Sequence, residues 1–532
     1  MHRALAIPEL LLSIVKEAVN QRSFFEWSTL VAFALTCRTF LEPALDVIWR
    51  KQNGLGHLVE CLPRDLWTIS PGEPLDILLL QEPTRPTVEQ DWERFDFYAR
   101  RVRELRCHPS KYLMHSSRIT SERLFLWLHL SRSGHQLLPN LTILTWTSMS
   151  SLVYYGSAHL LFGRQLSVLS IGSTVPSTNS GAIAHALLRL PPRSPNIQEL
   201  EVYFMEQGNF FQSTQPIIGD IFTSLQRLKC LSIHTNIPML YDDFAKLTTL
   251  PQLLVLNLTN GSGPILVAGP SRQGRDAFPD VTFRTLETLH LSCDFMENCI
   301  DVLSVCRFPC LKRVCPVSNR ISDAVTLGRA LQLVHERCSH TSLEAVQVYV
   351  GDWSSIRTSE AITIADIKPL CKFHHLRSFT IITEMCIVLD DRAVEELATS
   401  WPQLEDLHLS SLAPYPWPTP TATTLAGVAH FARYCPLLTT LEIDVNTASG
   451  TDVSTHAKPG DGYCNRSLLN IRFGQSPALG DPAQIAAFVF AIFPTLEHVN
   501  EDSNRRDESW VPVQDAFKAL HMAAQGQRNA SP

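Results

Sequence analysis

The stretch PQLEDLHL at residues 402–409 decides the fold, because its leucines follow the order Leu-x-x-Leu-x-Leu and the same phrase returns along most of the chain. Successive copies begin about 26 to 34 residues apart, which is the period of a stacked repeat architecture. The copies that open with proline are PNLTILTW from Pro139, PNIQELEV from Pro195, PQLLVLNL from Pro251, PCLKRVCP from Pro309, PQLEDLHL from Pro402, PLLTTLEI from Pro436 and PTLEHVN from Pro494. The copies without it are QLSVLSIG from Gln165, SLQRLKCL from Ser224, FRTLETLHL from Phe283, TSLEAVQV from Thr341, FHHLRSFTI from Phe373 and SLLNIRF from Ser467.

Each copy predicts a short strand that points its leucines inward and the residues between them outward. The outward residues are therefore the candidate site for a partner protein, and examples are Thr288, His290, Asp406 and His408. A stretch with helical spacing precedes each strand, so the predicted unit is helix, turn and strand. Such stretches include Ala393, Val394, Leu397 and Ala398, and then Val428, Ala429, Phe431 and Ala432.

One strand and one helix cannot bury their own leucines, whereas stacked neighbours close a common core. The sequence therefore predicts an α/β leucine-rich-repeat solenoid, with parallel strands on a concave face and helices on a convex face. About a dozen repeats would occupy residues 101–510, followed by a C-terminal helix and a disordered tail at 511–532. Three cysteines at the helix-to-strand corners are interpreted as packing groups, namely Cys310, Cys338 and Cys435.

Composition excludes several classes of protein. A hydrophobic content of 45% with 18% charged residues is globular, and a formal charge of -7 offers no basic field for nucleic acid. The sequence contains no run of 18 uncharged apolar residues, so it predicts no membrane span. The apolar stretch 4–19 is interrupted by charged residues, unlike the apolar core of a signal peptide. We therefore expect a protein of the cytoplasm or nucleus whose 14 cysteines are thiols.

Residues 1–51 do not follow the repeat and show three helical patterns, at 8–19, 28–35 and 39–51. In the third, Leu41, Leu45, Ile48 and Trp49 fall on one apolar face. A module of this size buries little apolar area by itself, so an exposed apolar face on it favours binding to a partner.

The ordered phrases IPELLLSIV from Ile7, LVAFALTCRTF from Leu30 and LDVIWRK from Leu45 resemble an F-box. With LPRDLW from Leu62 and DWERFDFYARRVREL from Asp91 after them, the chain also resembles the F-box family of mushroom-forming fungi. Ile7 stands where the motif usually has Leu, and the connector after the first phrase is longer than typical. The resemblance implies a substrate receptor of an SCF-type ubiquitin ligase, in which the F-box binds a Skp-type adaptor and through it a cullin and a RING subunit, while the repeats bind the substrate protein. The implied adaptor contacts are Ile7, Pro8, Leu10, Leu11, Ile14, Leu35, Cys37, Arg38, Phe40 and Trp49.

A second interpretation treats residues 1–51 as a helical cap over the open end of the first repeat, since solenoid ends need covering. The chain would then be a repeat scaffold for protein interactions with no role in ubiquitin transfer. A cap needs apolar helices but not the ordered F-box phrases.

Residues 52–100 carry several prolines and predict a joint, with a strand at 75–80 and a helix at 91–103. Longer irregular segments interrupt the repeats at 260–280, 411–424 and 446–465. Loop aromatics are candidate interface anchors, and Tyr415 and Trp417 are the leading pair. The others are Tyr203, Phe204 and Trp353.

No motif for catalysis or phosphate binding occurs, so no enzyme activity and no cofactor are expected. The cysteines at 293, 299, 306, 310 and 315 form a cluster in which Cys306 and Cys310, followed by Cys315, have a spacing compatible with zinc, but buried repeat positions favour packing. The residue types of Cys371, His374 and His375 also suit zinc, but these residues immediately precede a repeat strand, which again favours packing. Adjacent carboxylates such as Asp390 and Asp391 suit helix starts. We expect no metal.

Overall fold

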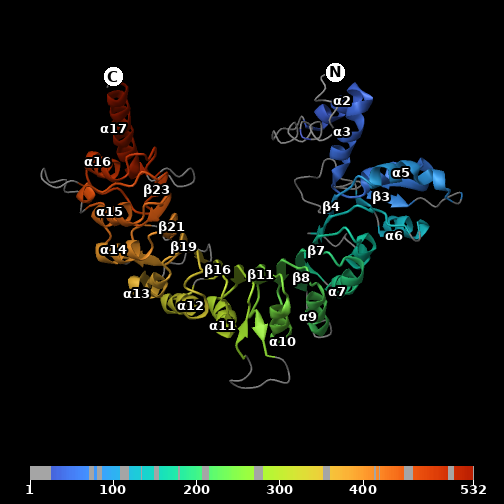
Figure 1. Cartoon of the computed structure of the whole chain (residues 1–532), viewed down its shortest axis with the longest axis horizontal. Coiled ribbons are helices and arrows are strands. Elements are labelled where there is room, and N and C mark those ends of the chain that lie inside the picture. The colour runs from blue at the N-terminus through green and yellow to red at the C-terminus, as the bar shows by residue number, and fades with distance from the viewer. Residues whose placement is uncertain are drawn as a thin grey trace. The chain divides into compact units, whose positions relative to one another are not determined.

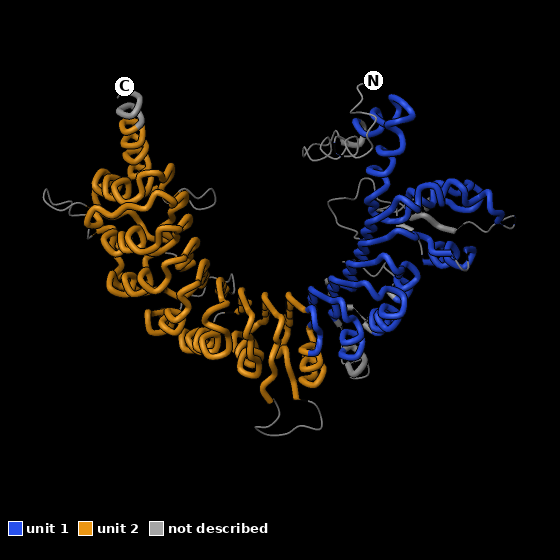
Figure 2. The backbone as a smooth tube through the Cα atoms, viewed as in Figure 1, with its two compact units in different colours: residues 1–235, 249–252 blue, residues 236–248, 253–532 orange. Residues whose placement is uncertain are grey.

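The computed structural model describes residues 13, 26–70, 77–80, 85, 87–107, 119–120, 122–132, 135–148, 155–177, 180–206, 215–268, 279–320, 322–351, 360–412, 415–417, 420–448, 459–500 and 508–530. It divides into two compact units (Figure 2), residues 1–235 with 249–252, and residues 236–248 with 253–532. The predicted positions 7, 8, 10, 11 and 14 lie outside the described residues, as does Trp353.

Unit 1 contains the N-terminal helices and the first repeats (Figure 1). Its repeat strands pair in parallel in the order β1-β4-β6-β7-β8-β9. These strands are β1 Lys51–Gln52, β4 Glu104–Cys107, β6 Ile143–Ser148, β7 Val168–Ser177, β8 Glu199–Glu206 and β9 Cys230–Thr235. A separate sheet has β2 Trp67–Ser70 antiparallel to β3 Ile77–Leu80, which is parallel to β5 Ile119–Thr120.

The helices of unit 1 include two that precede the first repeat strand and several that connect later ones. They are α2 Glu26–Thr36, α3 Arg38–Arg50, α4 Gly56–Val59, α5 Glu93–Ala99, α6 Glu122–Ser131, α7 Ser180–Leu188, α8 Leu190–Arg193 and α9 Gln215–Ser224. Three 3-10 helices are also present, η2 Arg64–Leu66, η3 Glu89–Trp92 and η4 Tyr155–Leu161. The helices predicted at 28–35, 39–51 and 91–103 are thus present with shifted bounds.

Unit 2 repeats the same order of strand and helix. Its strands pair in parallel as β11-β14-β16-β17-β19-β21-β22-β23. They are β11 Val255–Asn260, β14 Thr288–Cys293, β16 Arg313–Ser318, β17 Ala345–Val350, β19 Ser378–Thr383, β21 Asp406–Ser411, β22 Thr440–Ile443 and β23 Asn470–Arg472. Three small parallel pairs lie beside them, formed by β10 Met239–Leu240 with β12 Leu266–Val267, β13 Val281–Thr282 with β15 Cys306–Arg307, and β18 Ala361–Thr363 with β20 Cys386–Val388.

The helices of unit 2 lie on one side of these strands, except α17, which extends past the end of the strands (Figure 1). They are α10 Tyr241–Lys246, α11 Met296–Val305, α12 Ala324–Arg337, α13 Ile364–Ile367, α14 Asp391–Ser400, α15 Leu425–Tyr434, α16 Pro482–Ile492 and α17 Val511–Ala530, with η8 Lys368–Lys372, η9 Pro459–Gly462 and η10 Glu508–Trp510. The helix α17 occupies nearly all of residues 511–532, for which a helix and a tail were expected. None of the described helices combines the length and apolarity that crossing a membrane requires.

The core of each unit contains a row of buried residues, in which each residue is the register partner of the residue in the neighbouring strand. Leu105, Leu144, Leu169, Leu200 and Leu231 are paired in sequence along unit 1 and are buried. The corresponding row of unit 2 is Leu256, Leu289, Val314, Val346, Phe379, Leu407, Leu441 and Ile471. The alternation predicted from the sequence is confirmed, because β14 alternates half-buried and buried residues from Thr288 to Cys293.

Helices α12, α14, α15 and α16 begin where a side chain accepts a backbone hydrogen bond. Asp390 accepts from the Ala393 backbone N–H at 2.7 Å and starts α14, whose buried residues are the four that the spacing predicted. Asp323 and Asp481 cap α12 and α16 in the same way. Helix, turn and strand therefore recur as one unit of a leucine-rich-repeat solenoid.

Two predicted details are wrong. Cys310 is exposed, so it is not a packing group, whereas Cys338 and Cys435 are buried as expected and burial raises the pKa of each thiol to about 12. Tyr203 and Phe204 lie within β8 rather than in a loop, and Phe204 is buried. The strand β8 extends past the repeat phrase because its residues up to Phe204 pair with β7 on one side and with β9 on the other.

Candidate functional site

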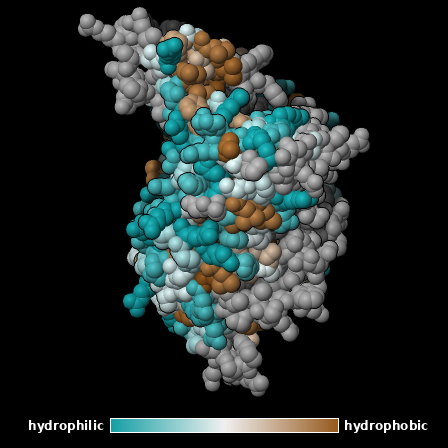
Figure 3. Space-filling model, turned by 90° about the vertical axis from the view of Figure 1, so that its right-hand side faces the viewer, coloured by the Kyte–Doolittle hydropathy of each residue, from teal (hydrophilic) through white to brown (hydrophobic). Residues whose placement is uncertain are grey.

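Helices α2 and α3 expose large apolar side chains. Leu35 is 77% exposed, Val31 47% and Leu41 37%, although all three lie on helices that also contribute buried residues. Figure 3 shows an apolar patch at this end of unit 1. An exposed apolar cluster of this kind marks an interaction surface more often than an isolated leucine does.

The predicted adaptor residues that the structure describes fall into two places. Leu35, Cys37, Arg38 and Phe40 surround the break between α2 and α3, where Cys37 is in extended conformation. The Phe40 ring stacks on Phe33 at 4.4 Å between ring centroids, which holds the two helices together. At 1.5 Å per residue, the other end of α3 with Trp49 lies roughly 13 Å from Phe40.

Trp49 faces the repeats instead. Its ring stacks on Tyr98 of α5, with centroids 4.3 Å apart. Directly after α3, β1 pairs with β4, Lys51 opposite Glu104 and Gln52 opposite Leu105. The C-terminal end of α3 is therefore joined to the first repeat, which leaves the α2 end as the side with exposed apolar residues.

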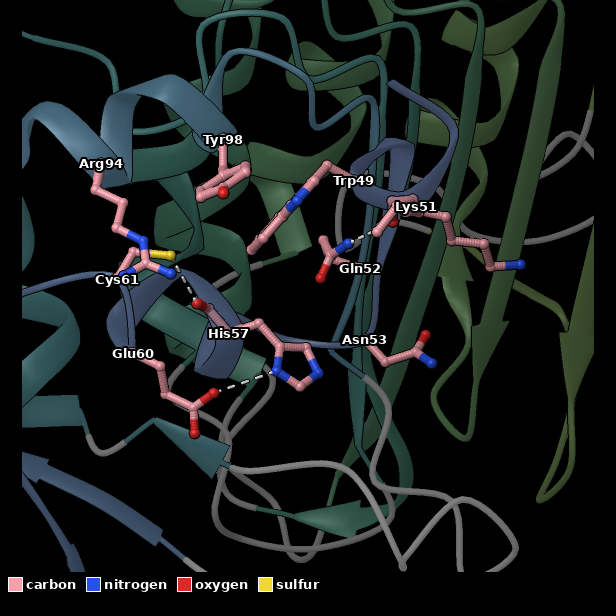
Figure 4. A pocket seen from close by; sticks show the side chains of 10 residues that line it. Trp49, Lys51, Gln52, Asn53, His57, Glu60, Cys61, Arg94 and Tyr98 are labelled. Carbon is pink, nitrogen blue, oxygen red and sulfur yellow. Dashed lines mark hydrogen bonds and ion pairs between the residues drawn. The ribbon is translucent and has the colours of Figure 1, made fainter. Parts of the chain in front are cut away.

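A pocket of about 510 Å³ opens beside this joint (Figure 4). Trp49 and Tyr98 form one wall, and the Nδ1 atom of His57 lies 3.4 Å from Glu60 on the opposite side. The Cys61 thiol donates to the His57 carbonyl, and burial raises the pKa of that thiol against the effect of nearby Arg94. A protonated thiol of this kind is a poor nucleophile.

The predicted partner-binding residues of unit 2 lie on the outward side of the strands. Thr288 and His290 are half-buried in β14, and Asp406 and His408 are half-buried in β21. Three strands separate β14 from β21, so at about 4.8 Å per strand the two pairs are roughly 19 Å apart. They belong to one face but not to one cluster.

His408 takes part in a polar group centred on Glu442 of β22. Its Nδ1 lies 3.4 Å from Glu442 Oε2, Ser410 Oγ donates to Oε1 at 2.6 Å, and Arg472 Nη1 is 3.9 Å away. Burial raises the pKa of Glu442, but the hydrogen bonds from His408 and Ser410 outweigh it and lower the pKa overall. The carboxylate is therefore ionised and fixed on the outward face.

Unit 1 carries a tighter group that the sequence did not predict. Ser170 Oγ donates to Glu201 Oε2 at 2.7 Å, the Tyr203 hydroxyl donates to Oε1 at 2.8 Å, and His234 Nε2 lies 3.3 Å from Oε1. The Tyr203 ring also stacks on His234 with centroids 4.5 Å apart. Hydrogen bonding from His234 is the main cause that lowers the pKa of Glu201 to about 2.

The alternation of the repeat could have revealed this group, because Ser170, Glu201 and Tyr203 all occupy outward positions of adjacent copies. Treating Tyr203 as a loop residue hid its relation to Glu201. Both polar groups give the strand face rigid carboxylates with oriented aromatic or imidazole neighbours, which suits recognition of a protein partner.

Tyr415 and Trp417 contact one another, with ring centroids 5.7 Å apart and planes at 79°. Tyr415 is 47% exposed and Trp417 is half-buried. The pair thus presents one exposed aromatic surface supported by the other ring, as an interface anchor requires.

The cysteines that suggested zinc are dispersed. Cys293 and Cys299 are buried with sulfur atoms 3.4 Å apart, whereas Cys310 is exposed. Within the described ranges, no three His, Cys, Asp or Glu side chains are grouped to hold a metal ion. Asp391 accepts from both the N–H and the hydroxyl of Thr424, so it serves the start of α15.

No protein-family model matches the sequence, and no curated protein matches it. Among solved structures, similar chains are an internalin, InlF, from Listeria monocytogenes (12% identity, TM-score 0.31, covering 66% of this chain and 84% of that one), the leucine-rich-repeat-containing LegL7 from Legionella pneumophila (10%, 0.27, 70% and 96%) and a chain of the mouse RP105/MD-1 complex (11%, 0.29, 79% and 73%). These identities and TM-scores are low, and the repeated helix, turn and strand of the chain itself define its architecture. The chain has the fold of a leucine-rich-repeat protein.

Proposed function

We propose that the chain is a non-catalytic substrate receptor of an SCF-type ubiquitin ligase inside the cell. Helices α2 and α3 bind a Skp-type adaptor, which connects them to a cullin and a RING subunit. The outward strand residues and the Tyr415–Trp417 pair bind the protein to be ubiquitinated.

The observation that carries the proposal is the two-sided character of the N-terminal helices. One end is joined to the first repeat by the Trp49–Tyr98 stack and the pairing of β1 with β4. The other end exposes Val31, Leu35 and Leu41. A receptor benefits from this arrangement, because a rigid joint keeps a bound substrate at a fixed distance from the adaptor and reduces the entropy lost in assembly.

The ordered F-box phrases supply the identity of the partner. Leu35, Cys37, Arg38 and Phe40 occupy the second phrase, and they lie together at the break between α2 and α3. A partner that covers this break would bury the exposed apolar side chains and also contact the Arg38 guanidinium.

The alternative is a repeat scaffold without a ubiquitin role, and one contact favours it. The strand β1, which directly follows α3, pairs with β4 and so covers the open edge of the repeats. Covering that edge is the role of a cap. A cap does not need an exposed Leu35 side chain, whereas binding to an adaptor would bury it. The two functions therefore differ in the role of Leu35.

Binding of a purified Skp-type adaptor to the full chain and to Leu35→Glu tests the proposal by titration calorimetry. Burying one leucine is worth about 1.5 to 3 kcal/mol, so the variant should bind at least about tenfold more weakly. Leu130→Glu is the matched control, because Leu130 is 71% exposed on α6 away from the F-box phrases. Equal affinity of all three proteins, or no binding to the unaltered chain, would leave the scaffold as the function.

A further inference from the structure

A second pocket of unit 1, of about 380 Å³, is lined mainly by arginines. It lies where α3 meets the segment between α5 and β4. Its charged lining residues are Glu42, Asp46, Arg50, Arg100, Arg101 and Arg103.

Both carboxylates of this pocket are already used by Arg101. Its Nη2 donates to Glu42 at 2.5 Å and its Nη1 donates to Asp46. The Arg101 side chain is only 5% exposed, and within the described part of the chain its buried Nε has no hydrogen-bond partner. Buried donors are normally satisfied, so an unpaired one is unusual.

The other three guanidinium groups have no carboxylate partner among the described residues. Arg103 donates once, to the Asn140 backbone carbonyl at 3.2 Å, and the Arg100 guanidinium lies 4.9 Å from the centre of the Phe97 ring. Arg50 ends α3 and is exposed. Four guanidinium groups against two carboxylates leave the pocket with a net charge of +2.

We propose that this pocket binds a phosphate monoester. Such a group carries about -1.5 to -2 charges and three acceptor oxygens at pH 7, which matches the net charge and the several donors of the pocket. Guanidinium groups bind phosphate oxygens through paired, charge-assisted hydrogen bonds. A single carboxylate would neutralise only half of the charge.

The site goes beyond the proposed function and does not depend on it. Arg50 belongs to the N-terminal helices, whereas Arg100 and Arg103 belong to the approach to the first repeat. A phosphate held by both would strengthen the joint between them, whatever the helices bind. The same chemistry could come from a phosphorylated protein segment or from a small phosphorylated molecule.

Thermal unfolding of the full chain in increasing inorganic phosphate, at constant ionic strength set with sodium chloride, tests the site. Ligand that binds only the folded state raises the melting temperature in a saturable way. The double variant Arg50→Gln with Arg100→Gln should require roughly tenfold or more phosphate for the same shift, since hydrogen bonds to charged groups are worth about one factor of ten each. Arg123→Gln with Arg164→Gln is the matched control, because both residues are exposed outside the pocket and the charge change is the same.

The site would be supported if phosphate raised the melting temperature of the unaltered chain and of the control variant equally, and raised that of the pocket variant less. An equal response of the pocket variant, or an equal shift with chloride alone, would overturn it. A phosphoserine peptide and its serine counterpart identify the source, because tighter binding than inorganic phosphate indicates a protein segment and equal binding indicates a small molecule.

Discussion

Gly172 determines how closely β7 and β8 can approach one another. Its φ is +129°, and a Cβ atom added there would lie 2.3 Å from the Tyr203 carbonyl oxygen. Gly172 and Tyr203 are register partners, next to Ser170 and Glu201. Because Gly172 has no side chain, the Tyr203 backbone can lie close to it. This close approach places Tyr203 in the polar group around Glu201.

Gly172→Ala should destabilise the protein by about 1 to 3 kcal/mol, because a residue with a side chain is strained at this φ and clashes with backbone atoms. The melting temperature reports the loss. Gly181→Ala in α7 is the control, since no atom lies within 4 Å of its added Cβ, and it should cause no loss. Equal effects of the two substitutions would show that the approach of β7 to β8 is not limiting.

Glu201 should make stability depend on acid pH. Its pKa is lowered from 4.5 to about 2 in the folded protein, so the stabilisation is fully present above the unfolded value and is lost as pH falls toward about 2. The melting temperature of Glu201→Gln should therefore approach that of the unaltered chain between pH 5 and pH 3. A constant difference across this range would mean that Glu201 is not held ionised by its neighbours.

At the scale of elements, Asp391 connects two successive repeats. It lies in the first turn of α14 and accepts from both the N–H and the hydroxyl of Thr424, the N-cap of α15, at 2.7 Å each. Gly427 of α15 accommodates the carboxylate, because a Cβ there would lie 2.2 Å from Asp391 Oδ1. One side chain thus fixes the start of the following helix.

Asp391→Ala should cost about 1 to 3 kcal/mol, because it leaves a half-buried N–H and hydroxyl without their charged acceptor. Glu395→Ala removes the same charge from α14. Glu395 is half-buried and lies 3.9 Å from His430 Nδ1 without a hydrogen bond, among the described residues, to the start of α15, so this change should alter stability by less than about 0.5 kcal/mol. Melting temperatures of the two variants provide the comparison. Similar losses would show that charge, rather than the link to α15, stabilises this helix.

Most elements could be predicted from the repeat, because the leucine phrase specifies both the strand and its inward side. Each predicted copy from Pro139 to Ser467 forms a strand. The last copy, PTLEHVN, forms only a single bridge between Ile471 and Val499. The small pairs such as β10 with β12 were not predicted, because two-residue strands have no periodicity to detect.

Site residues were harder to predict than elements, because outward positions carry no pattern of their own. His408 and Asp406 were placed on the correct face, but the partner of His408 is Glu442 of the next strand, and Ser410 donates to the same carboxylate. The arginine pocket joins residues 42 to 103, which no local phrase connects. Only the register of neighbouring segments brings such side chains together.

At the scale of the whole molecule, the proposed function places adaptor binding and substrate binding on different surfaces. The apolar end of α2 and α3 would bind the adaptor, and the outward strand residues would bind the substrate. Each surface can then change without the other, because the buried leucine rows separate the residues that hold the fold from those that meet partners. A loss of adaptor binding should leave substrate binding intact.

Hydrogen exchange of the full chain with and without a purified Skp-type adaptor tests this division most directly. We predict that the adaptor slows exchange of backbone amides in residues 26–41, while β14 and β21 exchange at unchanged rates. Unchanged exchange at residues 26–41, or protection confined to the strands, would contradict the assignment of the N-terminal helices as an F-box.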